Sequence, residues 1–157
     1  MKETLKNREL FHICTCPDFE LTLNKSYNTD RIKRTYEKVC REKKEREEEF
    51  EKYRNSYCLD LPKRNECLYV CREADIDIWV KKLIRGNYSR CKIYKLSLDG
   101  EIFWADAYYF DDHEDADVKK YWNGCSPENP DVDSLEGLFV GCLLYTSPSP
   151  RDRTRSR

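Results

Sequence analysis

The dipeptide Asp99-Gly100 and the two segments beside it constrain the fold of this chain more than any other feature. Residues 92–98 (KIYKLSL) and 101–110 (EIFWADAYYF) are rich in strand-forming residues. An Asp-Gly pair between two such segments is a strong signal for a tight turn, because glycine adopts the positive φ that the turn needs. The sequence therefore predicts an antiparallel hairpin with its turn at residues 99–100.

Three further segments are predicted to form strands. Each is a short apolar run rich in aromatic or branched side chains, and each is too short to be a typical buried helix. They are residues 10–16 (LFHICTC), 66–71 (ECLYVC) and 134–140 (SLEGLFV).

One long, charged helix and two shorter helices complete the predicted order of elements. The long helix is expected over residues 30–57, with Asp30 as its N-cap. Its middle stretch, REKKEREEE, is interpreted as a solvated face with a structural rather than a functional role. The shorter helices are expected over residues 73–85, before Gly86, and over residues 114–122. Strands and helices in this order predict the α+β class.

The last sixteen residues, 142–157 (CLLYTSPSPRDRTRSR), resemble a translated sequencing adapter. The end sequence of transposase-based library kits, read in one frame, encodes CLLYTSPSPRD without a mismatch. We therefore expect one domain over residues 1–141, truncated at its C-terminal end, and a non-native tail over residues 142–157.

Charge and hydropathy exclude several classes of protein. Without the four arginines and one aspartate of the tail, 25 basic and 29 acidic residues remain, a net charge of −4. This balance is not typical of a protein that binds nucleic acid. No apolar run is long enough to span a membrane, and the N-terminal MKETLKNREL lacks the hydrophobic stretch of a signal peptide. We expect a cytoplasmic protein with neither a nucleic-acid nor a membrane partner.

Eight cysteines remain outside the tail, and two pairs of them raise the question of zinc. Cys14-x-Cys16 and Cys67-x-x-x-Cys71 could each supply two thiolates, although a zinc site more often uses Cys-x-x-Cys spacing. Both pairs lie in predicted strands, where cysteine also serves as a small buried apolar residue. We favour the buried role and no metal, and a cysteine-based zinc domain is the weaker alternative.

Five segments together carry a resemblance to a known family. They are LFHIC, RNECLYVC, KIYKLSLDGEIFWADA, VKKYWNG and LEGLFV, at residues 10–14, 64–71, 92–107, 118–124 and 135–140. In this order they resemble a family of uncharacterised bacterial domains of unknown function, over most of residues 8–140. That family is similar in fold to ADP-ribosyltransferases. The resemblance implies a split β-sheet and the use of NAD, or a related nucleotide, as a substrate.

The resemblance also implies a site assembled from three strands. In ADP-ribosyltransferases a His or Arg on the first strand contacts a ribose of NAD, and a residue near the second strand meets the nicotinamide. A Glu near a late strand stabilises the positive charge that develops on the sugar. The matching positions here are His12, Arg64 and Tyr69 for nucleotide binding and Glu136 for catalysis.

Each of these residues also has a structural alternative. His12 could be a partly buried hydrogen-bonding residue, Arg64 could pair with any of many acids, and Glu136 could face solvent. Tyr121 and Trp122 are interpreted as packing residues, and Asp106 as a residue that satisfies backbone groups at the edge of the sheet. The expected function is NAD or nucleotide binding, with ADP-ribosyl transfer or NAD hydrolysis. The alternative is an inactive binding module that acts with a protein partner, for example in phage defence.

Overall fold

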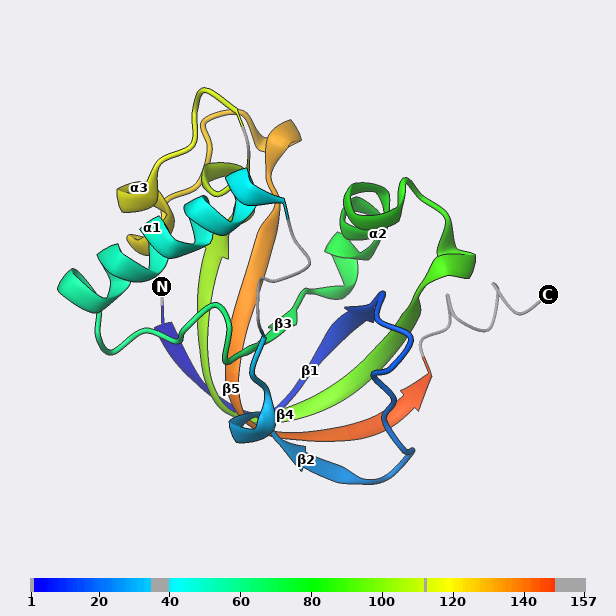
Figure 1. Cartoon of the computed structure of the whole chain (residues 1–157). Helices are drawn as coiled ribbons and strands as arrows, with labels where there is room; N and C mark the ends of the chain where they lie inside the picture. The colour runs from blue at the N-terminus through cyan, green and yellow to red at the C-terminus, as the bar shows by residue number, and fades with distance from the viewer. Residues whose placement is uncertain (1, 35–39, 112, 149–157) are drawn as a thin grey trace.

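The computed structural model describes residues 2–34, 40–111 and 113–148 of the chain. Five antiparallel strands form one sheet, and three helices lie against it (Figure 1). The predicted α+β class, with one long charged helix and two shorter ones, is confirmed. Within the described ranges, no helix has the length and apolarity needed to cross a membrane.

The strands pair in the order β1-β4-β5-β2, and β3 lies beside β5 as well. The long strands are β1 (Lys2–Cys14), β4 (Lys92–Asp106) and β5 (Leu135–Pro148). Two short strands share the remaining edge of β5. β3 (Leu68–Val70) pairs with residues 137–139, and β2 (Ser26–Asn28) pairs with residues 142–144.

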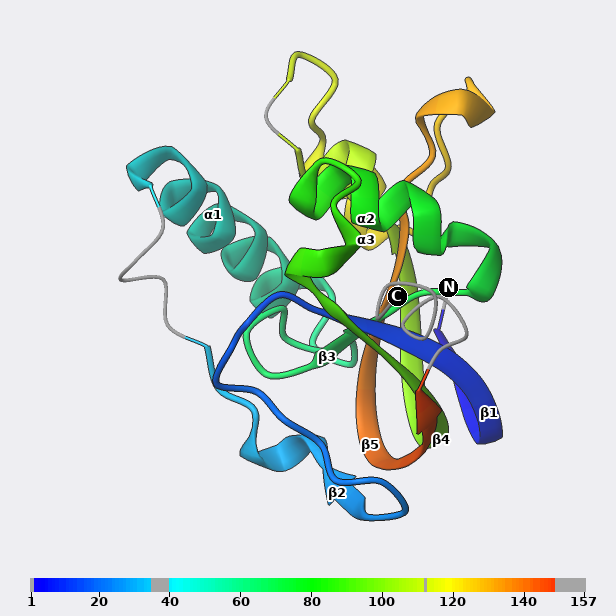
Figure 2. The same cartoon turned by 90° about the vertical axis from the view of Figure 1, so that its right-hand side faces the viewer.

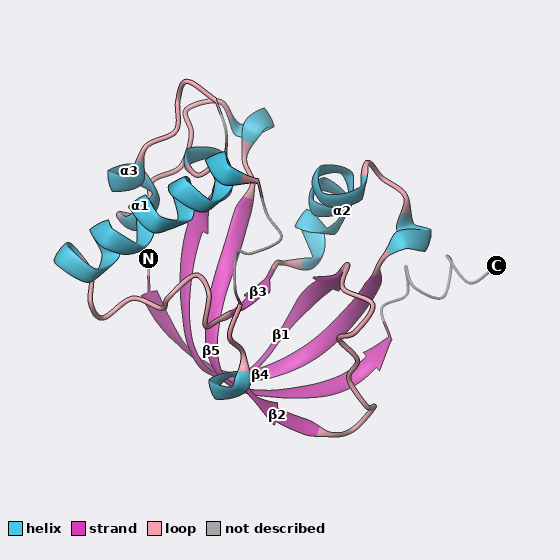
Figure 3. Cartoon of the chain, in the orientation of Figure 1, coloured by secondary structure: helices cyan, strands magenta, loops and turns pink. Residues whose placement is uncertain are grey.

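The long strands curve strongly along their length, so that the sheet curls on itself (Figure 3). In the middle of the sheet Gly100 of β4 lies opposite Gly141 of β5, with φ angles of 156° and 146°. A Cβ atom on Gly100 would lie 2.3 Å from the carbonyl oxygen of Val140, so glycine is required there. β1 has a bulge at the same level, where Asn7 has a φ of 49° and donates its N–H to Asp99.

The hairpin predicted at Asp99-Gly100 is therefore wrong, because β4 passes through both residues as one continuous strand. The two halves of β4 pair with β1 and β5 instead of with each other. The conformational freedom of Gly100 serves a bend within a strand rather than a turn between two strands.

A contact between β1 and β3 brings the two sides of the curled sheet together. Phe11 and Cys71 exchange two backbone hydrogen bonds of 3.0 and 2.8 Å. The interior that results is filled by apolar side chains from all the long strands and β3. Its fully buried members include Leu68, Leu96, Leu98, Ile102 and Phe139.

The helices cover different parts of the sheet (Figure 2). Helices α1 (Arg41–Tyr57) and α3 (Val118–Trp122) pack with each other and against β4 and β5, through Phe50, Trp122 and Phe103. Helix α2 (Ile76–Ile84) packs against the ends of β1 and β4. It follows a short 3-10 turn and ends where Gly86 donates its N–H to Val80, close to the predicted bounds.

Three predicted boundaries are wrong. Helix α3 begins at Val118 rather than at residue 114, because the Asp117 side chain caps it by accepting the N–H groups of Lys119 and Lys120. Helix α1 begins at Arg41 rather than at residue 30, since Thr29 is buried and accepts a hydrogen bond from the Gly141 N–H. Ile32 is extended there, and residues 35–39 of the predicted helix lie outside the described residues. β1 begins at Lys2, ahead of the predicted residue 10, because residues 2–5 pair with residues 100–103 of β4. This half of the strand is mostly exposed and has no apolar run that could have predicted it.

β5 continues into the segment that we ascribe to an adapter. It runs to Pro148 and pairs with β4 along that length, and Leu143 and Tyr145 are buried in the sheet interior. Residues 143–145 thus extend the last strand, while residues 149–157 lie outside the described part of the chain. The origin of the tail stays an inference from its sequence.

Candidate functional site

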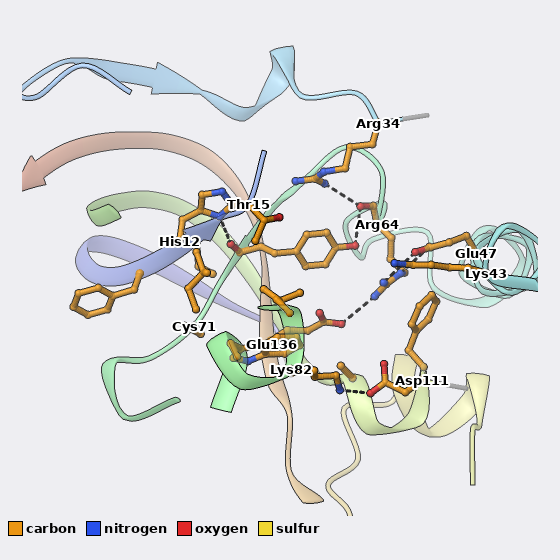
Figure 4. Close-up of a pocket in the computed structure, with 18 of the residues that line it drawn as sticks. His12, Thr15, Arg34, Lys43, Glu47, Arg64, Cys71, Lys82, Asp111 and Glu136 are labelled. Carbon is orange, nitrogen blue, oxygen red and sulfur yellow. Dashed lines mark hydrogen bonds and ion pairs between the residues drawn. The ribbon is translucent and has the colours of Figure 1, made fainter. Parts of the chain in front are cut away.

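A cavity of about 540 Å³ opens between α1 and α2, above the ends of β1, β3 and β5 (Figure 4). The four residues identified from the sequence, His12, Arg64, Tyr69 and Glu136, all line it. They come from β1, the loop before β3, β3 itself and β5. The curled sheet and the β1–β3 bridge therefore bring together residues that are up to 124 positions apart in the chain.

Arg64 is buried at the centre of a hydrogen-bonded cluster, with an exposure of only 9%. Its Nε and Nη2 donate to the two oxygens of Glu47 at 2.9 and 3.1 Å. Its Nη1 donates to Glu136 Oε2 at 3.0 Å and to the Tyr121 hydroxyl. The guanidinium also stacks on Phe110, 3.8 Å from the ring centroid. Arg64 thus forms part of the cavity wall from a buried position in which its hydrogen bonds are made to other side chains.

Glu136 is held at the start of β5 by one of its two oxygens. Tyr121 donates its hydroxyl to Oε2 at 2.7 Å, and Arg64 donates to the same atom. Among the described residues no hydrogen bond reaches Oε1. Burial raises the pKa of Glu136 above its ordinary value, although Arg64 and Tyr121 act in the opposite direction. The site therefore presents an oriented carboxyl group with one oxygen available to a ligand.

The cluster contains more buried acid than buried base. Arg64 faces two carboxylates, Glu47 and Glu136, which are 5% and 7% exposed. A single guanidinium cannot neutralise both, so one negative charge is left over when both acids are ionised. The pKa of Glu136 is raised mainly by its burial. A cationic group on a ligand next to Glu136 would relieve the charge imbalance of the cluster.

His12 is oriented by the backbone of β3. Its Nδ1 lies 2.7 Å from the carbonyl oxygen of Tyr69, and because a carbonyl can only accept, Nδ1 carries the proton. Nε2 of the neutral ring is then an acceptor for a hydroxyl group. Burial lowers the pKa of His12 to about 4; the hydrogen bond to Tyr69 opposes this shift and the nearby Arg34 charge adds to it.

We expect His12→Asn to flatten the acid side of the stability profile. His12 stays neutral in the folded chain down to about pH 4, whereas the ordinary pKa of a histidine is 6.5. As the pH falls, the unfolded chain therefore takes up the proton first. The wild type should lose stability as the pH falls below 6.5, by up to about 2 kcal/mol at pH 5. Asn keeps a donor for Tyr69 and does not titrate. Urea unfolding at pH 7.5, 6 and 5 measures the difference, and parallel profiles for the two proteins would contradict it.

Tyr69 lies between two guanidinium groups. Arg34 and Arg64 stack on its ring at 4.9 and 5.3 Å from the centroid, and its hydroxyl donates to the Arg64 carbonyl oxygen at 2.8 Å. Arg34 is itself positioned by a 2.7 Å hydrogen bond to the carbonyl oxygen of Cys67. Burial raises the pKa of Tyr69 well above its ordinary value, so the residue acts as a neutral phenol.

Sequence reasoning missed two residues of this cluster. Glu47 belongs to the charged run that we had interpreted as solvated, and that interpretation is wrong for this position. The spacing Glu47, Phe50, Arg54 placed it on the buried side of α1, and this signal could have identified it. Tyr121 does pack, as predicted, but its hydroxyl also holds Glu136. Asp106 has the predicted backbone role: it accepts the N–H groups of Tyr108 and Ser134.

The cysteines do not gather at this cavity. Within the described ranges, no group of three or more His, Cys, Asp or Glu side chains is placed to hold a metal ion. Cys14, Cys67, Cys71 and Cys91 are buried, and Cys16 and Cys40 are exposed. Cys71 lines the cavity together with oxygen and nitrogen groups of His12, Tyr69 and Glu136.

Comparison with known proteins gives a family for most of the chain. A family model described as "Protein of unknown function (DUF2441)" matches residues 3–145. No curated protein matches the sequence.

Proposed function

The chain belongs to the DUF2441 family of proteins of unknown function, and we propose from its cavity that it binds NAD or a related nucleotide and cleaves the nicotinamide–ribose bond. The observation that carries this proposal is the convergence of His12, Tyr69 and Glu136 from three strands on one cavity, with Glu136 Oε1 available. The proposal includes an ADP-ribosyltransferase-like fold in a bacterial, cytoplasmic protein.

The charges that line the cavity support an anionic ligand with a cationic end. Five basic and three acidic residues line it, so positive charge is in excess. The acids Glu47 and Glu136 lie together around Arg64, and the third, Asp111, is paired with Lys82. A dinucleotide fits this pattern, because its phosphates are negative and its nicotinamide ring is positive.

The chemistry requires a carboxylate directed at the sugar. As the bond between ribose C1′ and the nicotinamide nitrogen breaks, the electron pair leaves with nicotinamide and positive charge develops on the ribose. Glu136 Oε1 stabilises that charge more than it stabilises the ground state. Water, or the nucleophile of an acceptor, then bonds to C1′ and loses a proton. His12 Nε2 accepts a hydrogen bond from a ribose hydroxyl and so orients the sugar.

Glu136→Gln is expected to leave NAD affinity within about threefold of the wild type and to lower turnover at least about 100-fold. The amide oxygen of Gln can still accept hydrogen bonds from Tyr121 and Arg64, so the shape of the site is kept while the negative charge is lost. Calorimetric titration with NAD measures binding, and chromatographic detection of free nicotinamide measures turnover.

Glu49→Gln is the matched control, because Glu49 lies on the exposed side of α1 and its substitution removes the same charge. Equal turnover of wild type and Glu136→Gln would refute the role of Glu136, and no NAD binding by the wild type would refute the whole proposal.

One observation favours a second candidate, a binding module without chemistry. The Arg64 guanidinium pairs with Glu136 and so neutralises part of the charge that catalysis would need. In that case the wild type binds NAD, releases no nicotinamide, and uses the cavity to sense a nucleotide for a protein partner.

A further inference from the structure

A second cavity, of about 980 Å³, adjoins the first and has a different chemical character. The end of β1, the loop that follows it, β2 and the segment up to Arg34 form most of its wall. Leu68 of β3 and residues 142–143, the first two of the segment ascribed to an adapter, complete it. The two cavities share four lining residues, His12, Ile13, Thr15 and Arg34. Molecules bound in the two cavities would therefore lie next to each other, on either side of His12.

Only positive charge lines this second cavity. Lys25, Arg31, Lys33 and Arg34 face it, and no Asp or Glu is among its lining residues. None of these four cations takes part in a salt bridge within the described ranges, whereas Lys2, Lys92 and Lys95 each pair with a glutamate. Four cations without a counter-charge, in a chain whose net charge is negative, indicate a local site for an anion.

The rest of the wall is apolar and aromatic. Phe19, Leu21, Tyr27 and Ile32 line the cavity and are partly buried against the sheet interior. Phe19 meets the His12 ring edge-on with centroids 5.3 Å apart, and Lys25 lies 5.5 Å from the centre of the Tyr27 ring. Aromatic faces beside uncompensated cations suit a planar base that carries a phosphate.

We propose that the second cavity binds a phosphorylated small molecule of mononucleotide type, next to the ligand of the first cavity. The base stacks on the apolar wall, and its phosphate pairs with Arg31, Lys33 and Lys25. A long nucleic-acid strand fits less well, since its phosphates would extend beyond the cavity onto a surface with excess acid. The identity of the neighbouring ligand rests on the proposed function, but the second site itself does not.

The test uses 5′-UMP, which shares no base with NAD, titrated into the full chain with and without saturating NAD. Uridine and inorganic phosphate are titrated separately to assign the contributions of the base and the phosphate. The variant Arg31→Glu/Lys33→Glu reverses two exposed cations of the cavity. Lys81→Glu/Arg90→Glu is the control, because it makes the same charge change at exposed positions outside both cavities.

We expect 5′-UMP to bind the wild type and the control equally and the Arg31→Glu/Lys33→Glu variant at least about tenfold more weakly. Uridine should bind the wild type more weakly than 5′-UMP does. The NAD affinity of the Arg31→Glu/Lys33→Glu variant should differ from that of the wild type by less than about threefold. Equal 5′-UMP affinity in all three proteins overturns the proposal. A parallel loss of NAD affinity in the Arg31→Glu/Lys33→Glu variant also overturns it, because the two cavities would then form one dinucleotide site. Binding of single-stranded oligonucleotides but not of 5′-UMP overturns it as well. If NAD binds to no protein and the 5′-UMP pattern holds, only the proposed function fails.

Discussion

Arg64→Met is expected to lower the free energy of unfolding at pH 7 by about 3–5 kcal/mol. The substitution leaves Glu47 and Glu136 buried without their cation, and each is less than a tenth exposed. Met has a similar length and keeps the contact with Phe110, so the loss is that of charge compensation rather than of volume. Urea unfolding followed by circular dichroism measures it.

The pH dependence of this variant separates charge from packing. At pH 5 Glu136, whose pKa is already raised by burial, is protonated more easily without Arg64, so the difference from the wild type should shrink. Glu47→Gln/Glu136→Gln in the Arg64→Met background should recover much of the lost stability at pH 7. Arg41→Met is the control, because its partner Glu45 is exposed and such pairs contribute less than about 1 kcal/mol. A loss for Arg64→Met as small as that of the control would contradict the expectation.

Gly100→Ala is expected to lower the free energy of unfolding by about 3 kcal/mol or more. The φ of 156° is open to glycine alone, and the added Cβ would lie 2.3 Å from the Val140 carbonyl oxygen and 2.8 Å from the Gly141 Cα. Both contacts are to backbone in the neighbouring strand, so neither atom can move without disturbing the β4–β5 pairing.

Gly86→Ala provides the comparison. Gly86 also has a positive φ, of 81°, but no atom lies within 4 Å of its added Cβ. Gly86→Ala should lower the free energy of unfolding by about 1 kcal/mol, because only the backbone conformation disfavours alanine there. Thermal unfolding of both variants measures the contrast. Equal costs would show that the bend at Gly100 is not sterically restricted.

Local patterns identified most elements but not how they pair. Ile76, Val80 and Ile84 form a helical stripe that lies on one side of α2, and Gly86 ends that helix as predicted. The apolar runs at β3 and the start of β5 are strands as predicted. Each of these elements is predicted from residues close together in the sequence, which is the range over which propensity and periodicity act.

The candidate residues of the site could be identified from the resemblance, but the contacts between them and their neighbours could not. His12, Tyr69 and Glu136 were identified from the resemblance, and all three line one cavity. The roles of Glu47 and Tyr121 depend on contacts to Arg64 and Glu136, which are 17 and 15 residues away in the chain. No local pattern carries such information.

The sequence by itself determined the α+β class and the positions of α2, β3 and β5. Tertiary structure alone decided whether Gly100 lies in a turn or in a bend within a strand. An Asp-Gly pair favours a turn when the chain is considered locally, but pairing with β1 on one side and β5 on the other satisfies more backbone hydrogen bonds. Both outcomes use the same freedom of glycine, and only the partners across the sheet select between a turn and a bend.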